Sequence, residues 1–334
     1  PANVVGLNRD EYRAPRTYQY SIGVQEALGA KAVLSVAYVG SQSRNQNQWR
    51  QINLPDASTL PGLVASGGAG YNQLVPFLGF REIRWAENVQ ESHYNGLQAS
   101  IRGQVHPDLT LSAGYTLSKA IDPTGNGGSQ NGYDLNNISN PYVGFKYDEG
   151  PSAFDRRHVA YASFIYDIPL LKNSPNRGLK AALGGWQVSS IVTVESGAPL
   201  NILMSGTNVA SVIPNIQNRP DINGSIRYPK RVDQWFDTSV FSAPADGEWG
   251  NLPAHSVRGP GRQNWTLAVF KNFAFTETAR LEFRAEAFNA WNHPQFLGNV
   301  QGGGISNQFG ASNFGAVTGA YDPRTFQFGL KLFY

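Results

Sequence analysis

Alternation of apolar and polar residues at every second position is the feature that most limits how this chain can fold. In the segment RLEFRAE, residues 280–286, charges of alternating sign occupy the even positions and apolar residues lie between them. In a helix, Arg280 with Arg284 and Glu282 with Glu286 would form repelling pairs four residues apart. In a strand, all four charges lie on one face and the apolar residues lie on the other. The pattern therefore predicts a strand with two chemically different faces.

The same alternation recurs along the chain and predicts an all-β antiparallel fold. Each segment is close to the length of 9 to 11 residues with which a tilted strand crosses a membrane. With 36 Gly, 15 Tyr, 7 Trp and only 15% charged residues, the composition favours strands, turns and amphipathic rings. The segments are 16–25, 31–40, 95–105, 109–117, 156–168, 185–195, 264–273, 280–288 and 324–334. The pattern is weaker in 264–273 and in 156–168, which is apolar on both faces.

The connections between these segments alternate in length, apart from an intermediate one at 169–184. Brief periplasmic turns and long extracellular loops are typical of outer-membrane barrels, whereas such long loops are unusual in compact soluble domains. The alternation therefore predicts a transmembrane β-barrel with extended extracellular loops. The short turns are at Gly29, 106–108 and 274–278, and the long connections are 42–92, 121–154, 199–263 and 292–323.

The alternation also fixes a direction along the barrel. The first strand descends from the outside, and the last descends to end at Tyr334 in the periplasm. About nine strands are an odd number, which does not close a bacterial barrel with both ends in the periplasm. We therefore expect an odd number of further strands ahead of this chain, and residues 1–15 to be the end of an extracellular loop.

The charged face of 280–286 is assigned by its energetic cost. An Arg facing lipid at mid-depth costs about 2–4 kcal/mol. We therefore expect Arg280, Glu282, Arg284 and Glu286, together with Arg102 on another strand, to face the lumen, where opposite charges on neighbouring strands can pair. A soluble antiparallel sheet with one wet face explains any single strand equally well.

Composition excludes several other classes of function. With no cysteine, the chain has no disulfide, thiolate metal site or thiol nucleophile. A net charge of +3 without basic clusters argues against nucleic acid as a partner. No apolar run reaches the length of a spanning helix, and the sequence begins without Met or a signal peptide, so we expect its start to be a processed or truncated end.

Several stretches together resemble the C-terminal barrel portion of TonB-dependent receptors, particularly those with a carboxypeptidase-regulatory-like domain ahead of the plug. They follow one another in order over most of the chain, and the closing FQFGLKLFY is similar to the signal read by the barrel assembly machinery. The stretches are YQYSIGVQEALG, AYVGSQSR, SHYNGLQASI, LSAGYTLSKAID, FDRRHVAYASFIYDIP, GWQVSSIVTVESGAPL, VRGPGRQNWTLAVFKNF, RAEAFNAWNHPQF and FQFGLKLFY.

The resemblance implies a barrel of about 22 strands that encloses an N-terminal plug, and a TonB box that couples the plug to inner-membrane energy. Residues 1–334 would then be the C-terminal part of such a barrel, without its plug or signal peptide. The implied partners are outer-membrane lipid, the assembly machinery through the strand ending at Tyr334, TonB and the plug through the missing N-terminal part, and a scarce ligand.

No motif for catalysis or for binding a cofactor is present, and the five histidines lack the spacing of metal ligands, so we expect no enzyme activity, cofactor or metal. Asp134, Asp148, Glu149 and Asp155 leave a calcium or polar-ligand site as a minor alternative to a solvated loop. Aromatic residues in the long loops are candidates for stacking on a ligand, or equally for packing the loops together. These candidates are Tyr133, Tyr142, Trp235 and Trp249.

The sequence leaves three hypotheses about the function of the protein. The leading hypothesis is a C-terminal fragment of a receptor that imports a siderophore, oligosaccharide or peptide through a plugged barrel in the bacterial outer membrane. The first alternative is a small, self-contained passive barrel similar to a porin. The second is a soluble or surface-assembled all-β structural protein.

Overall fold

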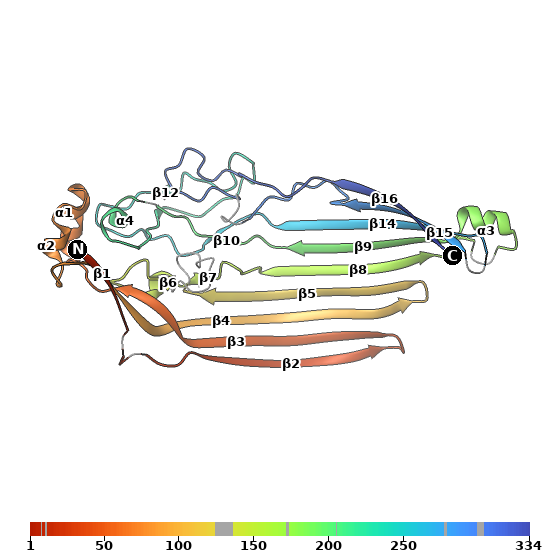
Figure 1. Ribbon diagram of the computed structural model, residues 1–334, viewed down its shortest axis with the longest axis horizontal. Coiled ribbons are helices and arrows are strands. Elements are labelled where there is room, and N and C mark those ends of the chain that lie inside the picture. Colours follow the sequence, from red (N-terminus) through yellow and green to blue (C-terminus); the bar gives the residue numbers. More distant parts are fainter. Residues whose placement is uncertain are drawn as a thin grey trace.

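The computed structural model describes the chain except residues 8, 11, 124–135, 172–173, 205, 277–278 and 299–303; for Asn136, Asn137 and Arg177 it describes only the backbone. Nine long strands form one antiparallel sheet in the order β16-β15-β14-β9-β8-β5-β4-β3-β2 (Figure 1). They fall on the nine segments predicted from the sequence, which confirms the predicted fold class. The strands are β2 (Arg16–Leu28), β3 (Ala32–Gln51), β4 (Phe80–His106), β5 (Leu109–Asp122), β8 (His158–Ile168), β9 (Trp186–Glu195), β14 (Arg262–Ala274), β15 (Arg280–Phe288) and β16 (Thr325–Phe333).

The connections lie at two opposite ends of the sheet. One end carries the short turns, the C-terminus and α3 (Arg177–Leu183), and the other carries the long loops and the N-terminus (Figure 1). At the loop end, β1 (Ala2–Leu7) pairs in parallel with the first residues of β4. Residues 2–7 therefore lie on the side of the molecule where the sequence predicts an extracellular loop.

The first long connection is shorter than the alternation predicts, because β3 continues to Gln51 and β4 begins at Phe80. A register shift between Ser43 and Gln46, with Asn45 at φ 55°, interrupts the regular pairing, which then resumes up to Gln51 and Arg84. Polar residues dominate both faces of this outer part of β3, so no alternation marks it in the sequence. Between the two strands lie η1 (Ala57–Thr59), α1 (Leu60–Ala65) and α2 (Tyr71–Leu74).

The sheet has two open edges. Within the described part of the chain, β2 pairs only with β3, and β16 pairs only with β15. The nine strands therefore form part of a barrel wall and do not close on themselves.

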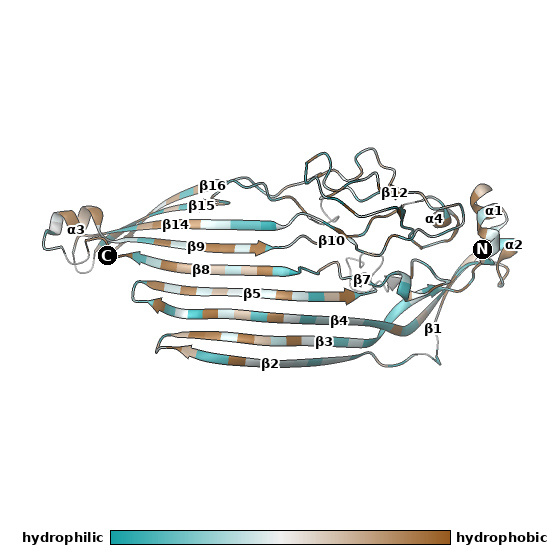
Figure 2. Ribbon diagram, turned by 180° about the vertical axis from the view of Figure 1, so that it is seen from behind, coloured by the Kyte–Doolittle hydropathy of each residue, from teal (hydrophilic) through white to brown (hydrophobic). Residues whose placement is uncertain are grey.

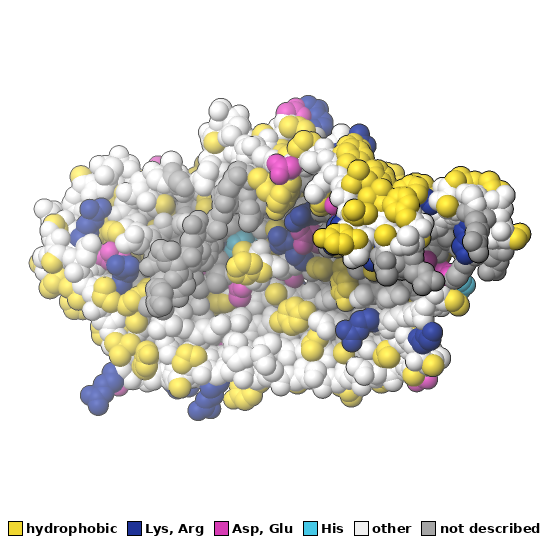
Figure 3. All heavy atoms as spheres, turned by 45° about the vertical axis from the view of Figure 1, so that its right-hand side comes forward, with side chains coloured by type: hydrophobic (Ala, Val, Ile, Leu, Met, Phe, Trp, Pro, Cys, Tyr) yellow, Lys and Arg dark blue, Asp and Glu magenta, His cyan; other side chains and the backbone are white. Residues whose placement is uncertain are grey.

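The sheet presents one predominantly apolar face and one predominantly polar face, because the register keeps apolar residues of adjacent strands opposite each other. Figure 2 shows the resulting bands of alternating hydropathy along the strands. Little of the protein covers the apolar face: Phe328 is 69% exposed and Leu330 is 71% exposed. In Figure 3, hydrophobic side chains gather toward the right-hand end of the view. The apolar face includes Ile22, Val24, Leu34, Val36, Leu97, Ile101, Leu111, Leu117, Phe164, Ile168, Val188, Val194, Leu267, Val269, Leu281, Phe283, Phe328 and Leu330.

Most of the packed interior lies in the long loops. One cluster joins α1 and α2 to α4 (Val209–Val212), and a second joins the segments around Ile202, Phe236 and Ile305. The loops also contain η2 (Phe145–Tyr147) and the short strands β6 (Asn136–Asn137), β7 (Gly150–Pro151), β10 (Pro199–Leu200), β11 (Asp221–Ile222), β12 (Phe241–Ser242) and β13 (Val257–Arg258). The loops thus form an ordered cap with hydrophobic cores of their own. Among the described residues, no helix is long and apolar enough to span a membrane.

Candidate functional site

The five charged residues expected to face the lumen lie on one face of the sheet. Arg102 pairs with Ser112, and the ladder continues through Ser163 and Ile191 to Thr266 on β14. Four residues further along β14, on the same side, Phe270 pairs with Arg284. Since side chains on a strand alternate in direction, Arg102 lies on the same polar face as the row Arg280, Glu282, Arg284 and Glu286.

The ion pairs of this row run along β15. Arg284 lies 3.7 Å from Glu282 and 3.9 Å from Glu286. Across the sheet, its neighbours are Gly329 and Phe270, and the guanidinium carbon lies 4.9 Å from the Phe270 ring centroid. The sequence predicts ion pairs between neighbouring strands. Arg284 instead pairs along its own strand, because neither of its cross-strand neighbours carries a charge.

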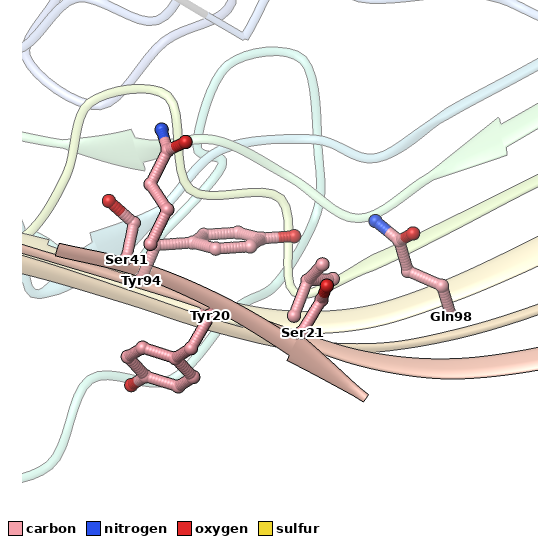
Figure 4. Close-up of a pocket in the computed structure, with 8 residues that line it drawn as sticks. Tyr20, Ser21, Ser41, Tyr94 and Gln98 are labelled. Atoms are coloured by element: carbon pink, nitrogen blue, oxygen red, sulfur yellow. The ribbon is translucent and has the colours of Figure 1, made fainter. Parts of the chain in front are cut away.

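A shallow hollow of about 440 Å³ lies at β2, β3 and β4, lined mainly by polar residues. Figure 4 shows Ser21, Ser41, Tyr94 and Gln98 on one side of the sheet and Tyr20 on the other. The alternation of the faces is thus visible in a single view. Hydroxyl and amide groups on this surface can donate and accept hydrogen bonds, but they are not arranged around an enclosed pocket.

The loop aromatics Tyr142 and Trp249 contact each other and hold loop segments together. Their rings meet edge to face with centroids 5.5 Å apart. The Tyr142 hydroxyl donates to the Pro55 carbonyl at 2.7 Å, and Trp249 Nε1 donates to the Ser139 carbonyl at 2.9 Å. Burial raises the pKa of Tyr142, which therefore stays neutral. Tyr142 is still 38% exposed, so part of it remains accessible.

Trp235 lies inside the second loop cluster and is only 8% exposed. Its Nε1 donates to the Arg258 carbonyl at 3.0 Å, and its ring contacts Phe296 edge to face at 6.2 Å. In this position it packs one loop against another. The remaining candidate, Tyr133, lies outside the described residues.

A buried ion pair that sequence reasoning missed joins two of the loops. Arg219 Nη1 lies 3.0 Å from an Asp148 oxygen, and both side chains are 2% exposed. Arg219 also donates through Nε to the Leu252 carbonyl at 2.9 Å and lies 3.8 Å above the Tyr147 ring. Burial raises the pKa of Asp148, and the charge of Arg219 and a hydrogen bond from the Ser139 N–H act against that rise. No sequence motif marks the pair, because its members are 71 residues apart.

A second carboxylate in this region is also engaged. Asp155 accepts from Arg258 at 2.7 Å and from the Ala120 backbone N–H at 2.9 Å. Two of the carboxylates considered for a calcium site, Asp148 and Asp155, are therefore paired with arginines, while Asp134 lies outside the described residues. In the part of the chain that the structure describes, no three His, Cys, Asp or Glu side chains form a group suited to a metal ion.

His255 lies in the same buried polar region and is 2% exposed. Its Nδ1 makes no hydrogen bond. Burial lowers its pKa to about 4; the charge of Asp122 opposes that change, and the charges of Arg219 and Arg258 add to it. The imidazole is therefore neutral at physiological pH and belongs to the interior of the loop cap.

Comparison with known proteins places these observations in one family. The sequence matches the outer membrane beta barrel domain family over residues 1–327. No curated protein sequence matches the chain. Among solved structures, the outer membrane transporter YddB from Escherichia coli is similar with a TM-score of 0.50 and 11% identity, over 97% of this chain and 33% of YddB. The likeness to YddB shows a shared fold, and this chain spans about a third of that transporter.

Two further structures are similar at lower scores. The ferripyoverdine receptor from Pseudomonas aeruginosa gives a TM-score of 0.45 and 12% identity, over 95% of this chain and 27% of that receptor. The ferric-catecholate import receptor Fiu from Escherichia coli K12 gives a TM-score of 0.44 and 12% identity, over 98% of this chain and 29% of that receptor. Because the family match extends over nearly the whole chain and the nine-strand sheet shares its fold with an outer-membrane transporter, the chain belongs to the outer membrane beta barrel domain family and is located in the bacterial outer membrane.

Proposed function

We propose that residues 1–334 form the C-terminal part of a TonB-dependent receptor barrel that imports a scarce ligand. The observation that carries the proposal is the open sheet of nine strands, in which no described residue pairs with the outer edge of β2 or of β16. A self-contained passive barrel needs these edges to pair with each other. Further strands that complete a barrel of about 22 would instead cover both edges.

In this proposal the apolar face contacts lipid and the polar face lines the lumen. Membrane barrels are apolar outside and polar inside, and the two faces of the sheet as a whole differ in this way, although β8 is apolar on both. Arg102, Arg280, Glu282, Arg284 and Glu286 then line a plugged lumen. The Arg284 side chain, with its two carboxylate neighbours, offers a surface to which polar groups of a plug can bind.

The loop cap would capture the ligand on the outside. Its two hydrophobic clusters and the Arg219–Asp148 pair give it a defined shape. Tyr142 combines partial exposure with a fixed orientation, which suits stacking on a sugar ring or an aromatic siderophore. Trp235 would act indirectly, by holding the loops together. Tyr133 and Trp249 remain candidates for ligand contact beside Tyr142.

The proposed partners follow from this assignment. A plug and a TonB box would come from a segment outside residues 1–334 and would couple uptake to inner-membrane energy. The barrel assembly machinery would recognise β16, which ends next to Tyr334, a residue that is 99% exposed. Membership of the outer-membrane family argues against the alternative of a soluble structural protein.

Uptake measurements test the proposal. Radiolabelled ferric siderophores, oligosaccharides and peptides are supplied at low concentration to the parent bacterium, to a strain lacking this gene and to a strain lacking TonB. We expect one ligand class to lose uptake in both mutants. Uptake that depends on the gene but persists without TonB would exclude energised transport.

A conductance measurement separates the proposal from the passive alternative. Purified residues 1–334 are added to a planar lipid bilayer without any upstream segment. We expect no stable channels, because a sheet with two open edges does not enclose a pore. Stable, long-lived conductance by this chain alone would support the small passive barrel.

A further inference from the structure

Helix α3 lies in the connection between β8 and β9, at the end of the sheet that carries the C-terminus (Figure 1). Asn176 caps its start, because its side-chain oxygen accepts from the Leu179 N–H at 3.0 Å. At its other end, the Gly184 N–H donates to the Lys180 carbonyl at 2.9 Å. The helix is thus a defined element inserted where the other turn-end connections are short.

The C-terminal end of α3 is held on the apolar face of the sheet. Lys271 on β14 pairs with Trp186 and Phe283 and shares that face with them. Its ammonium group donates to the Ala181 carbonyl at 2.9 Å and to the Gly184 carbonyl. A cation next to the last carbonyls of a helix also interacts favourably with the helix dipole.

This contact explains how a lysine lies on the apolar face. A charged side chain on the lipid-facing side of a barrel costs about 2–4 kcal/mol at mid-depth and about 0–1 near the interface. Lys271 is 1% exposed, its charge is bonded to carbonyls, and its ammonium nitrogen lies 5.6 Å from the Trp186 ring centroid. The lysine therefore connects the helix to the surface that we assign to lipid.

One side of α3 is apolar and exposed. Leu179, Ala182 and Leu183 follow the spacing of one helix face, and the two leucines are 48% and 49% exposed. In the neighbouring turn, Phe275 is 65% exposed. These exposed side chains lie at the turn end of the sheet, where Lys271 holds α3.

We infer that α3 is an interfacial helix that binds phospholipids of the periplasmic leaflet of the outer membrane. Leu179 and Leu183 enter the boundary between headgroups and acyl chains, and Lys180, on the flank of the stripe, extends toward headgroup phosphates. Phospholipid is the inferred ligand because Lys271 fixes the helix to the same face of the sheet that we assign to lipid on the strands. The inference therefore rests on the proposed assignment of the apolar face to lipid.

Site-specific labelling tests the inference, because the chain contains no cysteine and a single introduced cysteine is the only one in residues 1–334. Leu183→Cys in the full-length protein, with any native cysteines outside this segment replaced, is labelled with an environment-sensitive fluorophore. The protein is reconstituted in phosphatidylethanolamine and phosphatidylglycerol vesicles that contain spin-labelled lipid. We expect a blue-shifted emission and quenching at least about twofold stronger than for Ala181→Cys on the opposite side of the helix.

Two control positions make failure interpretable. Leu330→Cys on the apolar face should be quenched by the same lipid, and Thr193→Cys on the polar face should not be. Water-like emission at Leu183→Cys, with Leu330→Cys still quenched, would overturn the inference about α3 alone. If Leu330→Cys were not quenched either, the assignment of the apolar face, and with it the proposed function, would also fail.

A second variant tests the role of the lysine. Lys271→Met keeps a side chain of similar length but cannot donate to the helix carbonyls. We expect the label at Leu183 to lose at least about half of its lipid quenching, because the helix is no longer fixed to the sheet. Unchanged quenching in Lys271→Met would overturn the anchoring role of the lysine.

Discussion

Arg219 and Asp148 form an ion pair with 3.0 Å between Nη1 and the carboxylate oxygen, and both side chains are 2% exposed. The pair joins two extracellular loops across 71 residues of sequence. Removing one member leaves the other charged and buried, which costs about 3–5 kcal/mol.

Arg219→Met should therefore loosen the loop cap while the barrel strands stay assembled. We expect thermolysin to cleave the loops around residues 139–157 and 217–255 faster than in the parent protein. Arg231→Met is the matched control, because Arg231 pairs with Asp233 on the surface, where both side chains are about two-thirds exposed. An equal acceleration in both variants would contradict a special role for the buried pair.

His255 should make the loop cap sensitive to acid. Its pKa is about 4 in the folded protein and about 6.5 when unfolded, so the unfolded state binds more protons between these values. The contribution of His255 to the free energy of unfolding is therefore complete above about pH 6.5. It decreases by about 3 kcal/mol in all as the pH falls to about 4. Asp148, whose pKa burial raises, acts in the opposite sense.

The effect of His255 is isolated by comparing variants. We expect His255→Gln to remove most of the loss of loop protection between pH 6.5 and 4 in hydrogen exchange. His106→Gln, in an exposed turn, should retain the parent's pH profile. If His255→Gln kept the pH profile of the parent protein, another group would be responsible for the loss of loop protection.

Gly114 on β5 leaves room for an aromatic ring from the next strand. A Cβ at this position would lie 2.5 Å from Cε1 of Tyr161. Gly114→Ala should displace the ring and reduce the fraction of folded protein, measured from the mobility of unheated samples in detergent gels. Gly329→Ala is the control, since its nearest neighbour lies 4.0 Å away, and it should fold like the parent.

Neighbouring residues on β9 test the assignment of the two faces. Val192 lies on the apolar face, whereas Ile191, although apolar itself, lies on the polar face opposite Thr266. We expect Val192→Arg to cost about 2–4 kcal/mol in detergent or vesicle refolding, and Ile191→Arg to cost much less. If Ile191→Arg cost more than Val192→Arg, the polar face would be the one that contacts lipid and the apolar face would line the lumen.

The sequence alone located the nine strands, because most of them carry enough period-two alternation to define two faces, whereas residues 156–168 are apolar on both. The rows at 280–286 and 326–332 illustrate this: because charge in lipid is costly, the sequence predicts which of their faces turns away from lipid without knowledge of their neighbours. The lengths of β3 and β4 did not follow in the same way. Beyond Ser43, polar residues dominate both faces, and pairing between the two strands, which has no local signature, extends them to Gln51 and Phe80.

The sequence thus determined the all-β class, the order of the strands and the side of the sheet on which Arg102 and the row from Arg280 to Glu286 lie, because side-chain direction in a strand depends only on position along it. The tertiary structure alone decided how the loops pack, that Arg219 pairs with Asp148, that Trp235 is buried, and that Lys271 on the apolar face is bonded to α3. Each of these contacts joins residues far apart in the chain, and their energy comes from burial and charge pairing that arise only when the distant segments meet.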